Sequence, residues 1–134
     1  MEETNRREFL GTIAAGALAA GRIVHGAASE RKLKLGLIGC GWYGMVDLNA
    51  AFKAGNVEAV ALCDVDSAHL NACAQEVEKT QGTRPRTFKD YRELIASPGV
   101  DAVIIATPPH WHALPFIAAC EKGLHVYCEK PLSW

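Results

Sequence analysis

Three glycines at a fixed spacing constrain this chain more than any other feature. Gly39, Gly41 and Gly44 follow directly after an apolar run at residues 33–38 and open a segment, residues 44–54, with apolar side chains at helical spacing. A strand that enters a helix through Gly-x-Gly-x-x-Gly is typical of dinucleotide-binding folds. The first glycine allows the tight turn, the second lets the backbone approach a pyrophosphate, and the third lets the helix pack closely on the strand. Because the chain contains 12 glycines, a purely structural turn stays open as the alternative.

Strand-like and helix-like segments alternate along the rest of the chain. Short apolar runs predict strands at 33–38, 57–63, 100–105 and 125–128, and helical spacing predicts helices at 44–54, from 66 or 67 to about 77, at 90–97 and at 111–122. Helices between strands act as right-handed crossovers, which align the strands in parallel. The sequence therefore predicts an α/β domain over residues 32–134, with a doubly wound parallel sheet covered by helices on both faces, the NAD(P)-binding Rossmann fold.

An acidic residue stands where a bound dinucleotide would present its adenosine ribose. Asp64 follows the predicted strand 57–63 and lies 20 residues after Gly44, where a carboxylate accepts hydrogen bonds from the ribose hydroxyls of NAD. A 2′-phosphate would meet this carboxylate with no Arg or Lys between residues 54 and 78 to neutralise it. Each such contact costs up to roughly 4 kcal/mol at an effective dielectric of about 20. We therefore predict NAD rather than NADP. A helix N-cap is the alternative role for Asp64, although Asp66 is better placed for it.

The loop after the predicted strand 100–105 carries Thr107, Pro108, His110 and His112. In a doubly wound sheet, such loops border the crevice in which the nicotinamide lies. The two histidines have no nearby Cys, Asp or Glu to complete a ligand set, so we predict no metal site. We expect His112 near the start of its helix, within reach of the cofactor or of backbone.

The loop after the predicted strand 125–128 carries Glu129, Lys130 and Pro131. It ends at the same edge of the sheet as the glycine-rich turn, because the strands are parallel. Lys130 is either a solvated surface lysine or, beside a cofactor and a substrate hydroxyl, a proton-transfer group.

Four motifs occur in a fixed order and spacing. They are Gly39-Cys40-Gly41-Trp42-Tyr43-Gly44, Val100-Asp101-Ala102-Val103, Ala106-Thr107-Pro108 with His112, and Gly123-Leu124-His125-Val126-Tyr127-Cys128-Glu129-Lys130-Pro131. In this arrangement the chain resembles the N-terminal half of the glucose-fructose oxidoreductase and inositol dehydrogenase family, over about residues 32–134. The resemblance implies a nicotinamide dinucleotide in a Rossmann domain, and hydride transfer to or from sugars and cyclitols.

The resemblance also assigns roles to single residues. It implies that Lys130 is the active-site lysine, that Glu129 lies near the nicotinamide ribose, and that the Lys130–Pro131 bond is cis. The predicted cofactor-binding set is Gly39, Cys40, Gly41, Trp42, Tyr43, Gly44, Asp64, Thr107, Pro108, His112, Glu129 and Lys130.

The length of the chain bears on its activity. Members of the family continue into a large α+β domain that supplies the substrate pocket, whereas this sequence stops at Trp134. We therefore expect the N-terminal part of an NAD(P)-dependent oxidoreductase acting on CH–OH groups, inactive by itself and homo-oligomeric at full length. Two alternatives stay open. One is an NAD-dependent glycoside hydrolase, in which the cofactor oxidises a sugar hydroxyl, elimination follows and the hydride returns. The other is a non-catalytic dinucleotide-binding fragment.

Residues 1–28 are predicted to be a twin-arginine signal peptide. Arg6 and Arg7 precede Phe9, Leu10 and a charge-free run over residues 9–21. That run is too short to cross a bilayer, which takes roughly 20 residues. We expect periplasmic export by the twin-arginine translocase, with an N-terminal helix of a cytoplasmic protein as the alternative.

Charge and cysteine content argue against several kinds of partner and site. With 14 basic and 15 acidic residues the formal net charge is −1, which does not favour nucleic acid as a partner. Five cysteines at irregular spacings fit small buried apolar side chains better than a disulfide framework or a zinc site.

Overall fold

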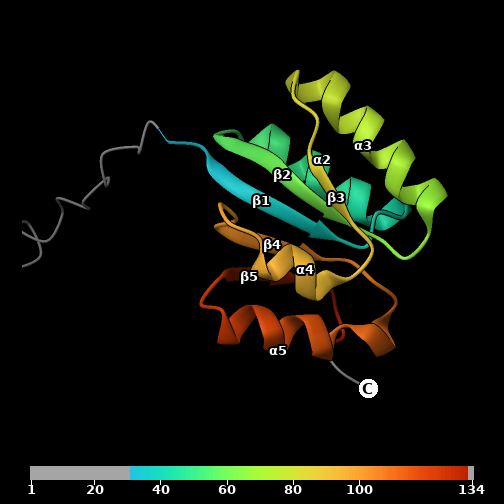
Figure 1. The fold of residues 1–134 in the computed structure, drawn as a ribbon, viewed down its shortest axis with the longest axis vertical. Coiled ribbons are helices and arrows are strands. Elements are labelled where there is room, and N and C mark those ends of the chain that lie inside the picture. The colour runs from blue at the N-terminus through green and yellow to red at the C-terminus, as the bar shows by residue number, and fades with distance from the viewer. Residues whose placement is uncertain (1–30, 133–134) are drawn as a thin grey trace, which may run out of the picture. The chain divides into compact units, whose positions relative to one another are not determined.

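The computed structural model describes residues 31–132, which form a five-stranded parallel sheet in the order β3-β2-β1-β4-β5 (Figure 1). The strands are β1 (Leu33–Ile38), β2 (Val57–Cys63), β3 (Arg86–Phe88), β4 (Ala102–Ile105) and β5 (His125–Cys128). The helices are α2 (Trp42–Ala54), α3 (Ser67–Gln81), α4 (Tyr91–Ala96) and α5 (Ala113–Glu121), with a 3₁₀ turn, η1 (Pro109–Trp111), before α5. The predicted doubly wound α/β fold is confirmed. The predicted signal peptide lies outside the described residues.

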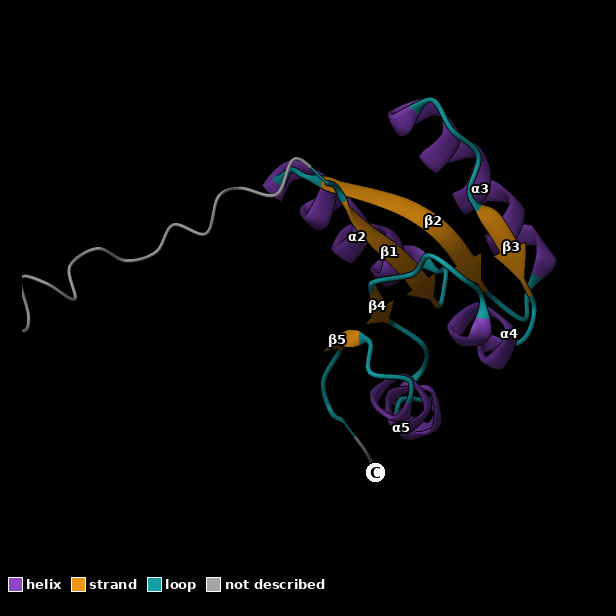
Figure 2. Cartoon of the chain, turned by 60° about the vertical axis from the view of Figure 1, so that its left-hand side comes forward, coloured by secondary structure: helices purple, strands orange, loops and turns teal. Residues whose placement is uncertain are grey.

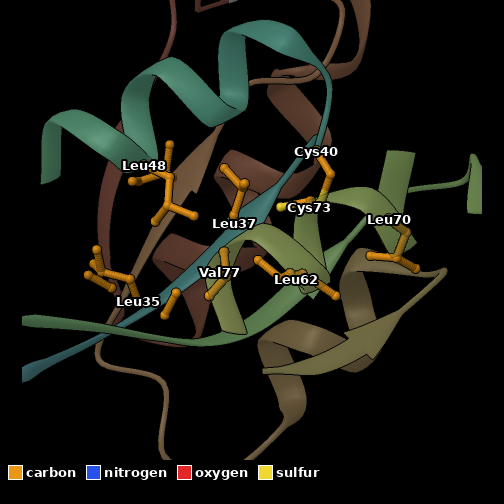
Figure 3. Packing of buried hydrophobic residues seen from close by; sticks show 12 residues of the cluster. Leu35, Leu37, Cys40, Leu48, Leu62, Leu70, Cys73 and Val77 are labelled. Atoms are coloured by element: carbon orange, nitrogen blue, oxygen red, sulfur yellow. The ribbon is translucent and has the colours of Figure 1, made fainter. Parts of the chain in front are cut away.

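Helices cover both faces of the sheet, α2 and α3 on one and α4 and α5 on the other (Figure 2). On the first face Leu48 of α2 and Leu70 and Val77 of α3 pack against Leu37 and Leu62 of the central strands (Figure 3). The second face is closed by other side chains of the same strands together with α4 and α5. Both faces are apolar because a parallel sheet exposes neither face to water.

The strand β3 was not among the predicted elements. Its three residues are polar or only partly buried, and it pairs with β2 at one edge of the sheet. So short a segment shows no periodicity to detect. The chain also enters α5 through η1 rather than by one continuous helix from residue 111. Gly123, with φ +75°, follows the last turn in the left-handed conformation that glycine favours.

All five cysteines are free thiols, and Cys40, Cys63 and Cys73 are buried in the core whereas Cys120 is exposed. Among residues 31–132 no group of three or more His, Cys, Asp or Glu side chains lies close enough to share a metal ion. Over the same range no helix has the length and apolar character needed to cross a bilayer.

Candidate functional site

A cavity of about 770 Å³ lies where the carboxyl ends of β1, β2 and β4 reach the edge of the sheet. Parallel strands place their following loops at one edge, so segments far apart in sequence border the same space. Of the predicted cofactor-binding residues, those that line it are Gly39, Gly41, Trp42, Tyr43, Asp64, Thr107 and Pro108. Cys40, Gly44, His112, Glu129 and Lys130 do not line it, and each has a different position described below.

The glycine-rich turn between β1 and α2 is shaped by close backbone contacts. Gly39 adopts φ +97°, and a Cβ atom there would come within 2.7 Å of the backbone of Ala106 and Thr107. A Cβ atom on Gly44 would overlap the carbonyl oxygen of Gly39. Gly41 differs from both, because a Cβ atom there would meet nothing within 4 Å. Two glycines are therefore required by the protein itself, while the third leaves an open space beside the cavity.

The amino end of α2 faces that open space with unused hydrogen-bond donors. Gly41 is the N-cap and provides no side-chain acceptor, and the first helical hydrogen bond runs from the Met45 N–H to the Gly41 carbonyl at 3.1 Å. The preceding N–H groups of the first turn have no partner within the helix. Together with the helix dipole they suit an anionic group such as a pyrophosphate.

Asp64 holds this turn in place. Its Oδ2 accepts the backbone N–H of Cys40 at 2.7 Å and its Oδ1 accepts the N–H of Asp66 at 2.8 Å. The N-cap role considered for Asp64 belongs to Asp66, which accepts the Ala68 N–H at 2.7 Å. Each carboxylate oxygen has further lone-pair capacity, so Asp64 can brace the turn and still accept a ribose hydroxyl. Cys40 contributes its backbone to this arrangement while its side chain is buried.

Sequence reasoning missed the segment that joins β3 to α4. Lys89, Asp90, Tyr91 and Arg92 all line the cavity. The Arg92 guanidinium lies 4.5 Å from the centroid of the Tyr91 ring and 3.3 Å from Oδ1 of Asp90. The unrecognised edge strand β3 brings this segment next to Asp64, and the N-capping pattern at Asp90 was the only signal for its place.

The Glu-Lys-Pro turn after β5 lies outside the cavity wall. The Lys130–Pro131 peptide bond is cis, as the resemblance implied, and the Lys130 side chain is exposed. The Glu129 N–H donates to the Ile105 carbonyl at 3.0 Å, which fixes the turn to the end of β4. The Tyr127 hydroxyl donates to Glu129 at 2.8 Å, and this bond to a carboxylate raises the pKa of Tyr127 to about 12.

A second carboxyl group faces this turn from α2. Burial, followed by the negative charge of Glu129, raises the pKa of Asp47 above its ordinary value. Its Oδ2 atom is shielded from solvent and has no hydrogen-bond partner among the described residues. Asp47 of α2 and Glu129 of the turn thus lie near enough for their charges to interact.

His112 is buried, with 1% of its surface exposed. Its Nδ1 lies 2.7 Å from the Pro131 carbonyl oxygen and its Nε2 lies 2.7 Å from the Thr107 carbonyl oxygen. Both contacts are to backbone, which is one of the two kinds of partner that the sequence predicted for this ring.

Comparisons with known proteins agree with this geometry. A family model described as an oxidoreductase family with an NAD-binding Rossmann fold matches residues 33–134. A glycosyl hydrolase family 109 protein of Stenotrophomonas maltophilia is 37% identical over 133 residues, which cover 92% of this chain and 29% of that protein. An inositol 2-dehydrogenase/D-chiro-inositol 3-dehydrogenase of Lactiplantibacillus plantarum is 32% identical over 107 residues, covering 79% of this chain and 29% of that protein.

Among solved structures, the WlbA dehydrogenase of Chromobacterium violaceum in complex with NADH and UDP-GlcNAcA superposes with a TM-score of 0.69 at 30% identity. The match covers 78% of this chain and 29% of that one. This chain therefore spans less than a third of the length of the relatives it matches.

Proposed function

Because this chain belongs to the GFO/IDH/MocA oxidoreductase family and carries its NAD-binding Rossmann fold, we propose that the 770 Å³ cavity binds NAD for hydride transfer at a sugar or cyclitol carbon. The observation that carries the proposal is the open space at Gly41, between the amino end of α2 and Asp64. Gly39 and Gly44 are explained by packing, whereas no atom of residues 31–132 lies close enough to position 41 to require a glycine there. A cofactor pyrophosphate would account for it.

The residues around the cavity fit the two halves of the cofactor. The turn at Gly41 and the first N–H groups of α2 would hold the pyrophosphate, and Asp64 would accept the adenosine ribose hydroxyls. Thr107 and Pro108, from the loop after β4, would border the nicotinamide half. When bound, NAD supplies the hydride acceptor, and the protein supplies position and charge.

We propose NAD rather than NADP as the cofactor, because the Asp64 carboxylate would repel a 2′-phosphate. Two cations nevertheless line the cavity, Lys89 and Arg92, and both lie beyond residues 54–78 in the sequence. Arg92 is partly neutralised by Asp90 at 3.3 Å. Lys89 is therefore the cation that would attract a 2′-phosphate and so oppose the preference for NAD.

Lys130 is proposed as the proton-transfer group of the whole protein. Its turn is anchored to β4 through Glu129 and to the cavity loop through His112. A lysine ammonium on a fixed backbone can give or take the proton of a substrate hydroxyl as the hydride moves. Glu129 is proposed to lie near the nicotinamide ribose.

A second candidate function is NAD-dependent glycoside hydrolysis. It is favoured by the 37% identity to a glycosyl hydrolase family 109 protein. The two functions share the cofactor site and differ in net redox change. Release of an aglycone by the whole protein with no net change in NADH absorbance supports hydrolysis, whereas accumulation of NADH supports dehydrogenation.

Export through the twin-arginine route is a further proposal, based on the motif at Arg6 and Arg7. In a cell-fractionation assay the whole protein is expected in the periplasm, and the double variant Arg6→Lys, Arg7→Lys is expected to stay in the cytoplasm. Periplasmic accumulation of the double variant would contradict the proposal. The exported protein is expected to act as a homo-oligomer.

Native mass spectrometry of the purified chain tests the central proposal. We expect a retained mass of one NAD, or its uptake on titration, with weaker uptake of NADP. The variant Lys89→Glu tests the charge argument separately, because it removes the cation that opposes the preference for NAD without touching the glycine turn. Tighter binding of NADP than of NAD would contradict the assignment of Asp64, and failure to bind either dinucleotide would contradict the site.

A further inference from the structure

The buried ring of His112 joins two loops that are far apart in sequence. Thr107, whose carbonyl it contacts, lies on the wall of the cavity, and Pro131, whose carbonyl it also contacts, directly follows Lys130. The ring is 1% exposed, so no water competes freely for either contact. Thr107 and Pro131 are 24 residues apart, and His112 is the side chain that holds their backbones at a fixed separation.

Both contacts of the ring are to acceptors. A carbonyl oxygen only accepts hydrogen bonds, and a neutral imidazole carries one N–H donor and one lone pair. With both nitrogens 2.7 Å from carbonyl oxygens, a neutral ring would bring a lone pair against an oxygen in one of the two contacts. An imidazolium ring donates in both, and 2.7 Å is the short distance typical of charge-assisted hydrogen bonds.

The hydrogen-bond partners of the ring are backbone groups. Within residues 31–132 no carboxylate is hydrogen-bonded to His112, and its two partners are both main-chain oxygens. The ionisable side chains on the adjoining segments are His110 before the ring, Cys128, Glu129 and Lys130 on the turn, and Cys120, Glu121 and Lys122 toward the far end of α5. An imidazolium at this place would donate a charge-assisted hydrogen bond to each of the two carbonyl oxygens, in place of the water that burial excludes.

We propose that His112 is a positioning residue, an imidazolium clamp that ties the cavity loop at Thr107 to the turn that carries Lys130. The inference rests on the proposed function in one respect, since it matters for the reaction only if Thr107 borders the cofactor and Lys130 acts on the substrate. The clamp sets where the lysine backbone lies relative to the cofactor without touching either substrate or cofactor.

The protonation of the ring is tested by nitrogen NMR on the chain labelled with 15N-histidine, recorded at pH 7.5 and assigned by comparison with His112→Asn. We expect both ring nitrogens of His112 to show the shifts and coupled protons of N–H groups. One unprotonated nitrogen on His112 would overturn the proposal. This readout needs no cofactor, so a failure of NAD to bind leaves it intact.

The clamp itself is tested by hydrogen exchange followed by mass spectrometry. In His112→Asn, whose single amide nitrogen cannot stand in for both ring nitrogens, amide exchange in residues 105–111 and 128–132 is expected to rise roughly tenfold to a hundredfold. Exchange in β2 is expected to stay unchanged, as is all exchange in the control variant His125→Asn. Unchanged exchange in the two segments, or an equal rise throughout the domain, would overturn the clamp. If the variant fails to fold, the His112 signals are assigned by elimination, from variants at the other histidines, and the nitrogen spectrum of the unmodified chain still decides the proposal.

Discussion

Adding a single methyl group at Gly41 or at Gly44 should separate cofactor binding from folding. A Cβ atom on Gly41 meets nothing within 4 Å, and the backbone there, φ −69° and ψ −175°, suits any residue. A Cβ atom on Gly44 overlaps the Gly39 carbonyl, which is backbone and cannot rotate away. The variants Gly41→Ala and Gly44→Ala therefore place the same group in a space open to a ligand and in a space that the protein fills.

The magnitudes follow from these surroundings. In Gly41→Ala, the reduced conformational entropy of the unfolded chain raises the free energy of unfolding by about 0.4–1 kcal/mol. This gain offsets a loss of about 0.5–1 kcal/mol, because alanine is a poorer N-cap residue than glycine. Its melting temperature should thus stay within about 4 °C of the unmodified chain. Its affinity for NAD should fall roughly 10- to 100-fold, as expected when a methyl group forces about 1–3 kcal/mol of strain. In Gly44→Ala the free energy of unfolding should fall by about 3 kcal/mol, and the melting temperature should be about 12 °C below that of the unmodified chain.

Both variants are examined by thermal unfolding without ligand and by calorimetric titration with NAD. The result that refutes the reasoning is specific for each variant. A folded Gly41→Ala that binds NAD within twofold of the unmodified chain would show that no pyrophosphate lies at the turn. A Gly44→Ala that melts at the unmodified temperature would show that α2 does not approach β1 as closely as described.

Three further changes test other parts of the site. Asp64→Ser should weaken NAD binding and narrow its margin over NADP, measured by titration with each dinucleotide; an unchanged margin would remove Asp64 from the ribose site. Lys130→Ala should abolish turnover by the whole protein yet leave NAD binding within about threefold, since the side chain lies outside the cavity wall; loss of binding would make the lysine a cofactor ligand. The raised pKa of Asp47 means that folding favours its protonated form, so stability is lost as pH rises from the ordinary carboxyl range through the raised value. Urea unfolding at pH 4 and pH 7 should therefore show Asp47→Asn gaining stability over the unmodified chain toward pH 7, and an equal difference at both values would contradict the shift.

Local sequence patterns were enough to predict the α/β class and seven of the residues that line the cavity. The strands β1, β2 and β4 are apolar runs whose side chains face helices on both sides, so composition alone marks them. The turn at Gly39 and Gly44 was equally readable, because close backbone contact excludes any side chain. The edge strand β3 was not, since Arg86 and Thr87 are exposed and carry no apolar signal.

The sequence by itself determined that the loops after the predicted strands meet at one edge of the sheet, because alternating strands and helices align those strands in parallel. Tertiary structure decided what each residue does there. It made Asp64 a brace for the Cys40 backbone, brought Lys89 and Arg92 to the cavity beside an edge strand that the sequence did not predict, and buried His112 between two carbonyl groups. These roles depend on atoms from strands far apart in the chain, and a hydrogen bond between such atoms has no spacing in the sequence that could reveal it.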